Sequence, residues 1–239
     1  MAKYPKAIWT PAAATNHGGP IGKITLGVMH IEQGTESGTN AWFKNPAAQV
    51  SSHFGVGKDG KVYQFVDTSV TAWAEVNYNG QAISIEHEGM SGTPLTPQQI
   101  AADEDLYVWI YHTHGVPLAR TTDPTKSGWI GHGELGVEGG NHISCPGAPI
   151  LAQINTIIAG AKTKLSTPNP SSAQLAAHGY VLLSNPVEAA LATKNGWAIF
   201  VWNGVGFSNA PASLPVGTHE YASKNYKTHN PAVAAPLGE

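Results

Sequence analysis

The chain has 239 residues, of which 41% are hydrophobic and 12% are charged, and its formal net charge is −3 at pH 7. This length fits one domain of about 150 residues and a smaller second one. The sequence has no basic run and no apolar stretch of about eighteen residues, which excludes binding to duplex nucleic acid and insertion into a membrane. A single cysteine also excludes a disulfide bond within the chain.

Strand-like patterns come first along the chain. Residues 23–30 and 81–89 show hydrophobic alternation. Residues 52–67 hold two alternating runs on either side of Asp59-Gly60, a dipeptide typical of tight hairpin turns. We therefore expect three strand regions, one of them a β-hairpin.

Two helices are predicted after these strands. The first has Thr96 as its N-cap, Pro97 at its first position, Gln99 completing a capping box, and Gly115 at its end. The second covers residues 148–165, where apolar residues recur at helical spacing. Strands followed by helices indicate an α/β (α+β) domain with a mixed central sheet flanked by helices.

The composition changes near the end of the predicted catalytic domain, which we place at residues 1–165. Residues 166–172, "STPNPSS", are expected to form an extended linker. Residues 173–229 are predicted to form a small α+β domain with the order strand, helix, strand, and residues 230–239 to form a flexible tail. The aromatic residues of the small domain either bind glycan or fill its core.

Three residues carry side chains that bind metals. His30 ends a predicted strand, His132 lies in "GWIGHGEL", and Cys145 lies in "SCPG". Two neutral imidazoles and one thiolate form a good zinc set, and three protein ligands leave a fourth position open for water. Spacing alone leaves structural roles open for each: a buried histidine at a strand end, a turn residue and a small core residue.

Several sequence blocks, in the same order, resemble the type-2 N-acetylmuramoyl-L-alanine amidases, a family that includes phage lysozyme-amidases and peptidoglycan recognition proteins. The blocks are "VMHIEQGT", "VSSHFGVGKDGKVYQFVD", "SIEHEG" and "GHGEL" followed by "CPG". Together they extend over about residues 20–165. The resemblance implies an enzyme that cleaves the amide between N-acetylmuramic acid and L-alanine, with one Zn²⁺ per chain in a groove at one edge of the sheet.

The same resemblance assigns roles to single residues. His30, His132 and Cys145 match the family's metal ligands. Glu86 matches a catalytic carboxylate, which orients or deprotonates the attacking water. Ser52 stands where other branches of the family have a tyrosine base, so Glu86 is expected to carry more of the proton transfer.

Two further departures affect the expected site. Ile143 replaces the residue that often steadies the oxyanion in the family, and His142 beside it is expected to act as the oxyanion donor or acid; the alternative is a histidine that supports the site indirectly or lies on the surface. Ala74 replaces a histidine that helps to bind substrate, which indicates rearranged substrate contacts around Trp73. The segment 34–49 is expected to be a loop that forms one wall of the substrate groove.

Aromatic side chains on that segment are expected to meet the substrate. Trp42 or Phe43 is predicted to stack on sugar or peptide, and Trp73, outside this segment, is predicted to contribute to substrate binding. The expected partner is bacterial peptidoglycan, with no nucleic acid and no membrane insertion, and the protein is expected to be a monomer.

The start "MAKYPKAIWTP" lacks the apolar region of a secretory signal. Together with the linker and the second domain, this indicates a phage endolysin made in the host cytoplasm and released to the cell wall through a holin-type exit. A cytoplasmic muropeptide-recycling amidase and a non-catalytic peptidoglycan-binding protein of the same fold are the alternatives. The second domain argues against the former, and Cys145 against the latter.

Overall fold

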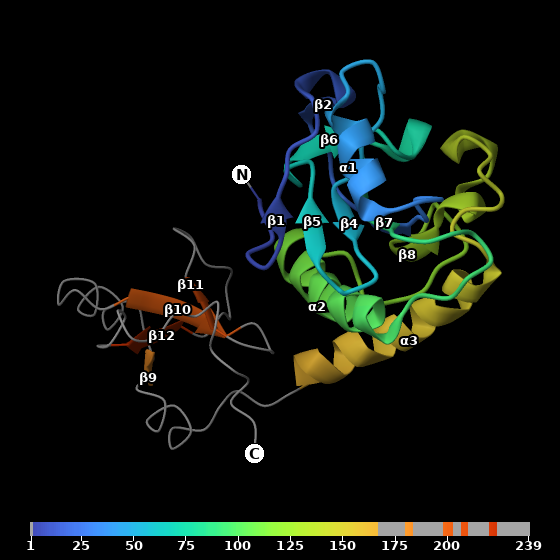
Figure 1. Ribbon diagram of the computed structural model, residues 1–239. Helices are drawn as coiled ribbons and strands as arrows, with labels where there is room; N and C mark the ends of the chain where they lie inside the picture. Colours follow the sequence, from blue (N-terminus) through green and yellow to red (C-terminus); the bar gives the residue numbers. More distant parts are fainter. Residues whose placement is uncertain (1, 167–179, 184–197, 203–206, 210–219, 224–239) are drawn as a thin grey trace. The chain divides into compact units, whose positions relative to one another are not determined.

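The computed structural model describes residues 2–166, 180–183, 198–202, 207–209 and 220–223. The chain divides into two compact units, Met1–Thr163 and Lys164–Glu239 (Figure 1). Residues 167–172 of the expected linker and the expected tail, 230–239, lie outside the described residues.

A mixed six-stranded sheet forms the centre of the first unit, in the order β1-β5-β4-β7-β3-β8. The strands are β1 (Ile8–Trp9), β3 (Leu26–Met29), β4 (Phe54–Val56), β5 (Val62–Gln64), β7 (Ala82–His87) and β8 (Gly128–Gly131). Strands β4, β7, β3 and β8 are parallel to one another, whereas β5 is antiparallel to β4. This arrangement confirms the predicted α/β class with a mixed central sheet.

The predicted hairpin is confirmed as β4 and β5. The turn between them contains Gly60 at a φ of 81°, which glycine adopts without a steric penalty. Beside the main sheet, β2 (His17–Pro20) and β6 (Val70–Ala72) form a second, two-stranded antiparallel sheet.

Three α-helices accompany the sheet: α1 (Glu36–Lys44), α2 (Pro97–His114) and α3 (Ala148–Ser166). Helix α2 has the predicted capping box between Thr96 and Gln99 and ends at Gly115 in the left-handed conformation. Figure 1 shows α2 and α3 together, with α1 at a separate place along the sheet. Short 3₁₀ helices complete the unit: η1 (Ala14–Asn16), η2 (Val76–Tyr78), η3 (His132–Leu135) and η4 (Val137–Gly139).

Helix α1 corrects one expectation, because the segment 34–49 was predicted to be a loop. The Thr35 hydroxyl accepts a hydrogen bond from the Gly38 amide and caps the helix. Glu36 in the first turn and Lys44 in the last turn complement the helix dipole. These end interactions stabilise a short helix in a stretch whose residues have weak helix propensity.

Neighbouring strand residues face opposite sides of the main sheet, and each side has its own contacts. Phe54 packs edge-on against Trp109 of α2, whereas the adjacent Gly55 faces the Glu36 side chain of α1. Helices α1 and α2 therefore cover opposite faces. The face opposite α2 also carries the metal-binding candidates.

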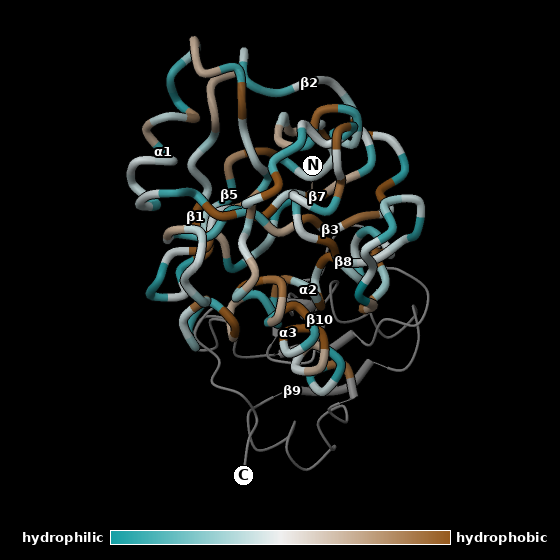
Figure 2. The backbone as a smooth tube through the Cα atoms, turned by 90° about the vertical axis from the view of Figure 1, so that its right-hand side faces the viewer, coloured by the Kyte–Doolittle hydropathy of each residue, from teal (hydrophilic) through white to brown (hydrophobic). Residues whose placement is uncertain are grey.

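Both faces are packed with apolar residues, and Figure 2 shows hydrophobic segments along β3 and β8. On the α2 face, Trp129 stacks on Tyr107 with ring centroids 3.2 Å apart. A Cβ at Gly27 would lie 2.4 Å from the Trp129 ring, so glycine is required there. On the other face, one buried cluster consists of Leu26, Val28, Ala82, Ile130 and Leu135.

The described part of the second unit is a four-stranded antiparallel sheet, in the order β11-β10-β12-β9. Its strands are β9 (Tyr180–Leu183), β10 (Ala198–Trp202), β11 (Phe207–Asn209) and β12 (Glu220–Ser223). The two predicted strands coincide with β9 and β10, and the helix predicted between them lies outside the described residues. Among the helices that the structure describes, none combines the length and the hydropathy of a membrane span.

Candidate metal centre

The parallel strands bring three predicted site residues to one level of the sheet. Met29, the last residue of β3, pairs with Gly131 of β8 and with Ile85 of β7. The next residue along each strand is therefore His30, His132 or Glu86. The His30 amide donates a hydrogen bond of 2.8 Å to the Ile85 carbonyl, which extends the β3–β7 pairing to this level.

Cys145 joins this group from the loop before α3. The Gly133 amide donates a 2.6 Å hydrogen bond to the Cys145 carbonyl, and the Cys145 amide donates one of 2.9 Å to the His142 carbonyl. These bonds fold the loop back over η3. As a result, one ligand atom from each of His30, His132 and Cys145 lies within 4.8 Å of the others.

The protonation states of the two imidazoles suit a metal site. Burial, followed by the nearby rings of His87 and His142, lowers the pKa of His30 to about 3. Burial, followed by His30, lowers the pKa of His132 to about 3. Both rings are therefore neutral near pH 7, and each retains a nitrogen lone pair for a cation.

The thiol of Cys145 completes the set. Burial raises the pKa of this thiol to about 12, so the free protein holds it protonated and a metal must displace the proton. Two neutral imidazole nitrogens and one thiolate sulfur match the donors that zinc prefers, with a fourth position left for another ligand. The residues present therefore fit a zinc ion.

Hydrogen bonds orient both histidine rings. Nε2 of His30 lies 3.0 Å from Oε1 of Glu75, and Nε2 of His132 lies 2.8 Å from the Gly139 carbonyl. In each case Nε2–H is the donor, which leaves Nδ1 as the nitrogen available to a metal. Glu75 is fully buried, and burial raises the pKa of its carboxyl group to about 7.

Glu75 was not predicted from the sequence. It follows Ala74, where the expected motif is broken, and it is the one charged residue between Asp67 and Glu86. A single charged residue in an otherwise uncharged segment is the sequence feature that could have identified Glu75 as part of the site. Its pairing with His30 depends on the fold, which brings together residues 45 positions apart.

Glu86 and His142 stand beside the predicted ligands. Oε1 of Glu86 lies 3.9 Å from Nδ1 of His30, and its Oε2 has no hydrogen-bond partner among the described residues. Burial, followed by the charge of Glu32, raises the pKa of Glu86 to about 8. The His142 ring is exposed and stacks on His132 with centroids 4.5 Å apart. Ile143 is 81% exposed.

The three expected substrate contacts have different environments. Trp42 on α1 is 52% exposed and is available to a ligand. Phe43 is buried, and its ring packs edge-on against Phe65 at 5.1 Å. This corrects the expectation for Phe43, because a buried ring offers no face to a substrate. Trp73 is partly buried, and its amide donates a hydrogen bond to the Ser51 hydroxyl.

Comparison with known proteins identifies the family of the chain. The profile of the N-acetylmuramoyl-L-alanine amidase family matches residues 20–148. The chain belongs to this family. The range that the family profile matches contains His30, His132 and Cys145.

Individual amidases also resemble the chain. N-acetylmuramoyl-L-alanine amidase A of Achromobacter lyticus is 38% identical over 87 residues, which is 36% of this chain and 49% of that protein. The match thus spans about half the length of this curated relative.

Two solved structures share the amidase fold. A selenomethionine derivative of AmpD has a TM-score of 0.53 at 17% identity, covering 66% of this chain and 98% of that one. A mutant endolysin from Bacillus subtilis has a TM-score of 0.50 at 20% identity, covering 67% and 99%.

Proposed function

We propose that the protein is a zinc-dependent peptidoglycan hydrolase that cleaves the amide between N-acetylmuramic acid and L-alanine. The main observation behind the proposal is that His30, His132 and Cys145 lie close together. One ligand atom from each residue lies within 4.8 Å of the others. Glu86 lies at the same level of the sheet, next to His30. A carboxylate beside such a ligand set suits the hydrolysis of an unactivated amide.

In the proposed reaction, one zinc ion per chain supplies Lewis-acid polarisation of the amide carbonyl and acidification of the attacking water. Glu86 accepts a proton from that water as the oxygen attacks the lactyl carbonyl carbon. The C–N bond then breaks, and the proton is delivered to the nitrogen of L-alanine. The products are the free carboxylic acid of N-acetylmuramic acid and a peptide with a new amino terminus.

His142 has a supporting role in this scheme. Its exposed ring, stacked on His132, is within the same cluster of groups. An imidazole N–H donates a hydrogen bond to the carbonyl oxygen as negative charge develops there, and an imidazolium protonates the leaving amine. Ile143 stands where the family usually has a residue that stabilises the oxyanion. In this scheme His142 takes over that role.

We further propose that the protein acts as a phage endolysin, with the second unit binding the cell wall. The separation of the chain into two compact units is consistent with a catalytic part and a targeting part. A truncated chain ending at residue 166 should cleave soluble muropeptides but bind intact sacculi more weakly than the full chain. Equal binding by the two proteins would contradict a targeting role.

Metal analysis combined with digestion of sacculi tests the amidase proposal. Protein purified without added metal should contain about one equivalent of zinc. Digestion should release new L-alanine amino termini and no new reducing sugars, because glycosidases produce the latter. Cys145→Ser should lose zinc and turnover together, and a variant with full zinc and full activity would overturn the ligand assignment.

A further inference from the structure

A buried ion pair lies on the α2 face of the main sheet, opposite the metal centre. The ring of His87, the last residue of β7, lies 3.0 Å from the carboxylate of Asp103 on α2, and neither side chain is exposed. Strand alternation puts His87 on the face opposite its neighbour Glu86. The proposed reaction uses Glu86 and gives the ion pair no role.

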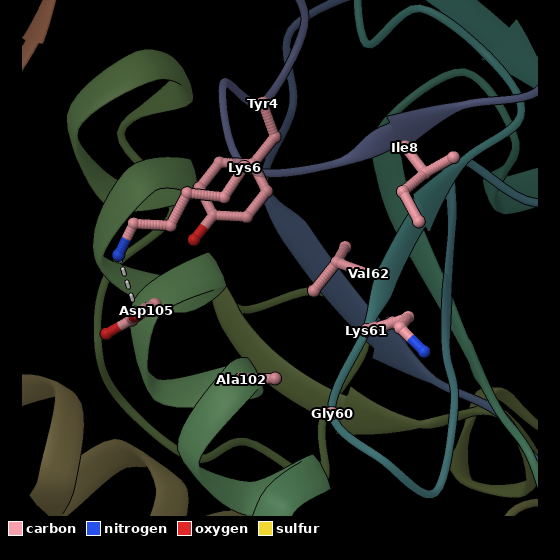
Figure 3. Close-up of a pocket in the computed structure, with 8 residues that line it drawn as sticks. All are labelled: Tyr4, Lys6, Ile8, Gly60, Lys61, Val62, Ala102 and Asp105. Carbon is pink, nitrogen blue, oxygen red and sulfur yellow. Dashed lines mark hydrogen bonds and ion pairs between the residues drawn. The ribbon is translucent and has the colours of Figure 1, made fainter. Parts of the chain in front are cut away.

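Stability alone does not explain this pair. Two charges lose favourable hydration when they are buried, and apolar residues of similar volume often stabilise a core equally well or better. Helix α2 carries a second ion pair for comparison: Asp105 lies 2.9 Å from Nζ of Lys6, beside a pocket of about 140 Å³ (Figure 3). The side chains of Lys6 and Asp105 are 43% and 19% exposed, so they keep part of their hydration. His87 and Asp103 keep none, and their further contacts therefore indicate their role.

The second ring nitrogen of His87 bonds to the backbone of a metal-ligand candidate. Nδ1 of His87 lies 2.8 Å from the carbonyl oxygen of His30. A carbonyl oxygen only accepts hydrogen bonds, so Nδ1 carries a proton and donates it. Nε2 donates to the carboxylate of Asp103. The ring of His87 therefore links α2 to the residue that follows β3.

The backbone of His30 is bonded to β7 on both sides of its Cα atom. Its amide donates a 2.8 Å hydrogen bond to the carbonyl of Ile85, and its carbonyl accepts the hydrogen bond from His87. Two fixed peptide groups set the direction of the Cα–Cβ bond, and this direction decides where the imidazole lies. Glu75, 3.0 Å from Nε2, holds the far end of the ring. His87 and Glu75 thus hold the same ligand, one at its backbone and one at its ring.

We propose that His87 is a positioning residue for the metal ligand His30 and that Asp103 holds the His87 ring in place. This role rests on the proposed zinc-dependent function. Both residues lie on the face opposite the metal centre, so they act through His30. The hydrogen bond from Nδ1 of His87 carries the role, whereas the charge of the ion pair does not. Without that bond, the His30 ring would shift relative to His132 and Cys145, and zinc would bind more weakly.

Two variants of the full-length protein separate positioning from stability. Asp103→Asn removes the ion pair but keeps the donor, because the Asn amide donates to Nε2 and leaves the proton of a neutral His87 on Nδ1. His87→Leu combined with Asp103→Leu, the Leu pair, packs without a buried charge but has no donor for the His30 carbonyl. Zinc affinity should fall about 10- to 100-fold in the Leu pair and stay close to that of the unmodified protein in Asp103→Asn.

Two control variants change the same helix. Tyr107→Phe removes a buried 2.9 Å contact between α2 and Sδ of Met29, the residue before His30, and leaves the His30 carbonyl bonded. Asp105→Asn weakens the partly exposed ion pair with Lys6. Both controls should keep the zinc affinity of the unmodified protein. At saturating zinc, the Leu pair should also lose kcat with little change in KM, because a misplaced ion affects the reacting bond and leaves distant substrate contacts intact.

Zinc affinity and amide cleavage together separate the possible failures. If the unmodified protein binds zinc but cleaves no amide, the amidase function fails, and weaker zinc binding by the Leu pair still supports the positioning role. If the unmodified protein cleaves sacculi and the Leu pair binds zinc as tightly, the positioning role is overturned and the amidase function stands. Thermal unfolding shows whether the Leu pair folds. If it does not, NMR of the isotope-labelled unmodified protein decides: Nδ1 of His87 should carry a slowly exchanging proton, and an unprotonated Nδ1 would overturn the role.

Discussion

The carboxylate of Glu75 lies 3.0 Å from Nε2 of His30, and both side chains are buried. This contact fixes the proton on Nε2 and directs Nδ1 toward the other ligands. We expect Glu75→Gln to weaken zinc binding about 10- to 100-fold, the usual range for a lost partner of a metal-binding histidine. Competition with a chromophoric chelator measures the affinity directly.

Glu138 offers a matched control for this prediction. It is an exposed carboxylate on η4, where it pairs with Asn77. Glu138→Gln should retain the affinity of the unmodified protein. Unchanged zinc affinity in Glu75→Gln would mean that His30 does not depend on this hydrogen bond.

Glu86→Gln should retain zinc but lose turnover by about 10²- to 10⁴-fold, because an amide cannot accept the proton of the attacking water. The side chain keeps its size, so the packing beside His30 should not change. Release of L-alanine amino termini from sacculi measures the rate, and elemental analysis measures the metal. Activity within a few-fold of the unmodified protein would assign the base to another group.

His142→Ala should also retain zinc and lose most of the turnover, by about 10²-fold or more, if its ring meets the charge on the carbonyl oxygen. Ser144→Ala is the comparison within the same loop, since Ser144 is exposed and its contact with the Ser91 hydroxyl is made by its backbone carbonyl. Ser144→Ala should keep close to normal turnover. Near-normal turnover in His142→Ala would mean that His142 does not stabilise the oxyanion and that the metal alone does so.

The buried pair of His87 and Asp103 predicts a pH-dependent contribution to stability. Burial lowers the pKa of His87, but the charge and hydrogen bond of Asp103, 3.0 Å away, outweigh it and raise the pKa above 6.5. A raised pKa stabilises the folded protein below the unfolded value, and this contribution is lost as the pH rises through the folded value.

Asp103→Asn should therefore lose more stability at about pH 5.5 than at about pH 8, because only at the lower pH does the unmodified protein gain from a charged His87. Urea unfolding of both proteins at the two pH values gives the difference. An equal loss in the free energy of unfolding at both pH values would show that the pair does not titrate in this range.

The sequence predicted the parts of the fold that carry strong local signals. The hairpin around Asp59-Gly60 and the capping box of Thr96 and Gln99 were identified because turn and cap chemistry is encoded within a few residues. Helix α3 was predicted from its apolar periodicity. The metal-ligand candidates came from residue chemistry and family resemblance, and the strand register explains why His30 and His132 meet.

The remaining parts depend on contacts between distant segments. Strands β1 and β8 have two and four residues, too few to show a reliable period. Helix α1 contains Gly38 and Asn40, and it is stabilised by its end caps and by the packing of Phe43 in the core. No local pattern reveals that packing, which is why Phe43 was assigned to the substrate and the segment to a loop.

A metal ion held by His30, His132 and Cys145 would also affect the stability of the first unit. His30 lies at the end of the central strand β3 and Cys145 lies just before α3, so a shared ion would act as a cross-link between two segments of the first unit that are far apart in the sequence. Loop closure over such a length removes many conformations from the unfolded chain. Metal affinity then adds to the free energy of unfolding, and a chelator should lower the Tm of the protein as well as its activity.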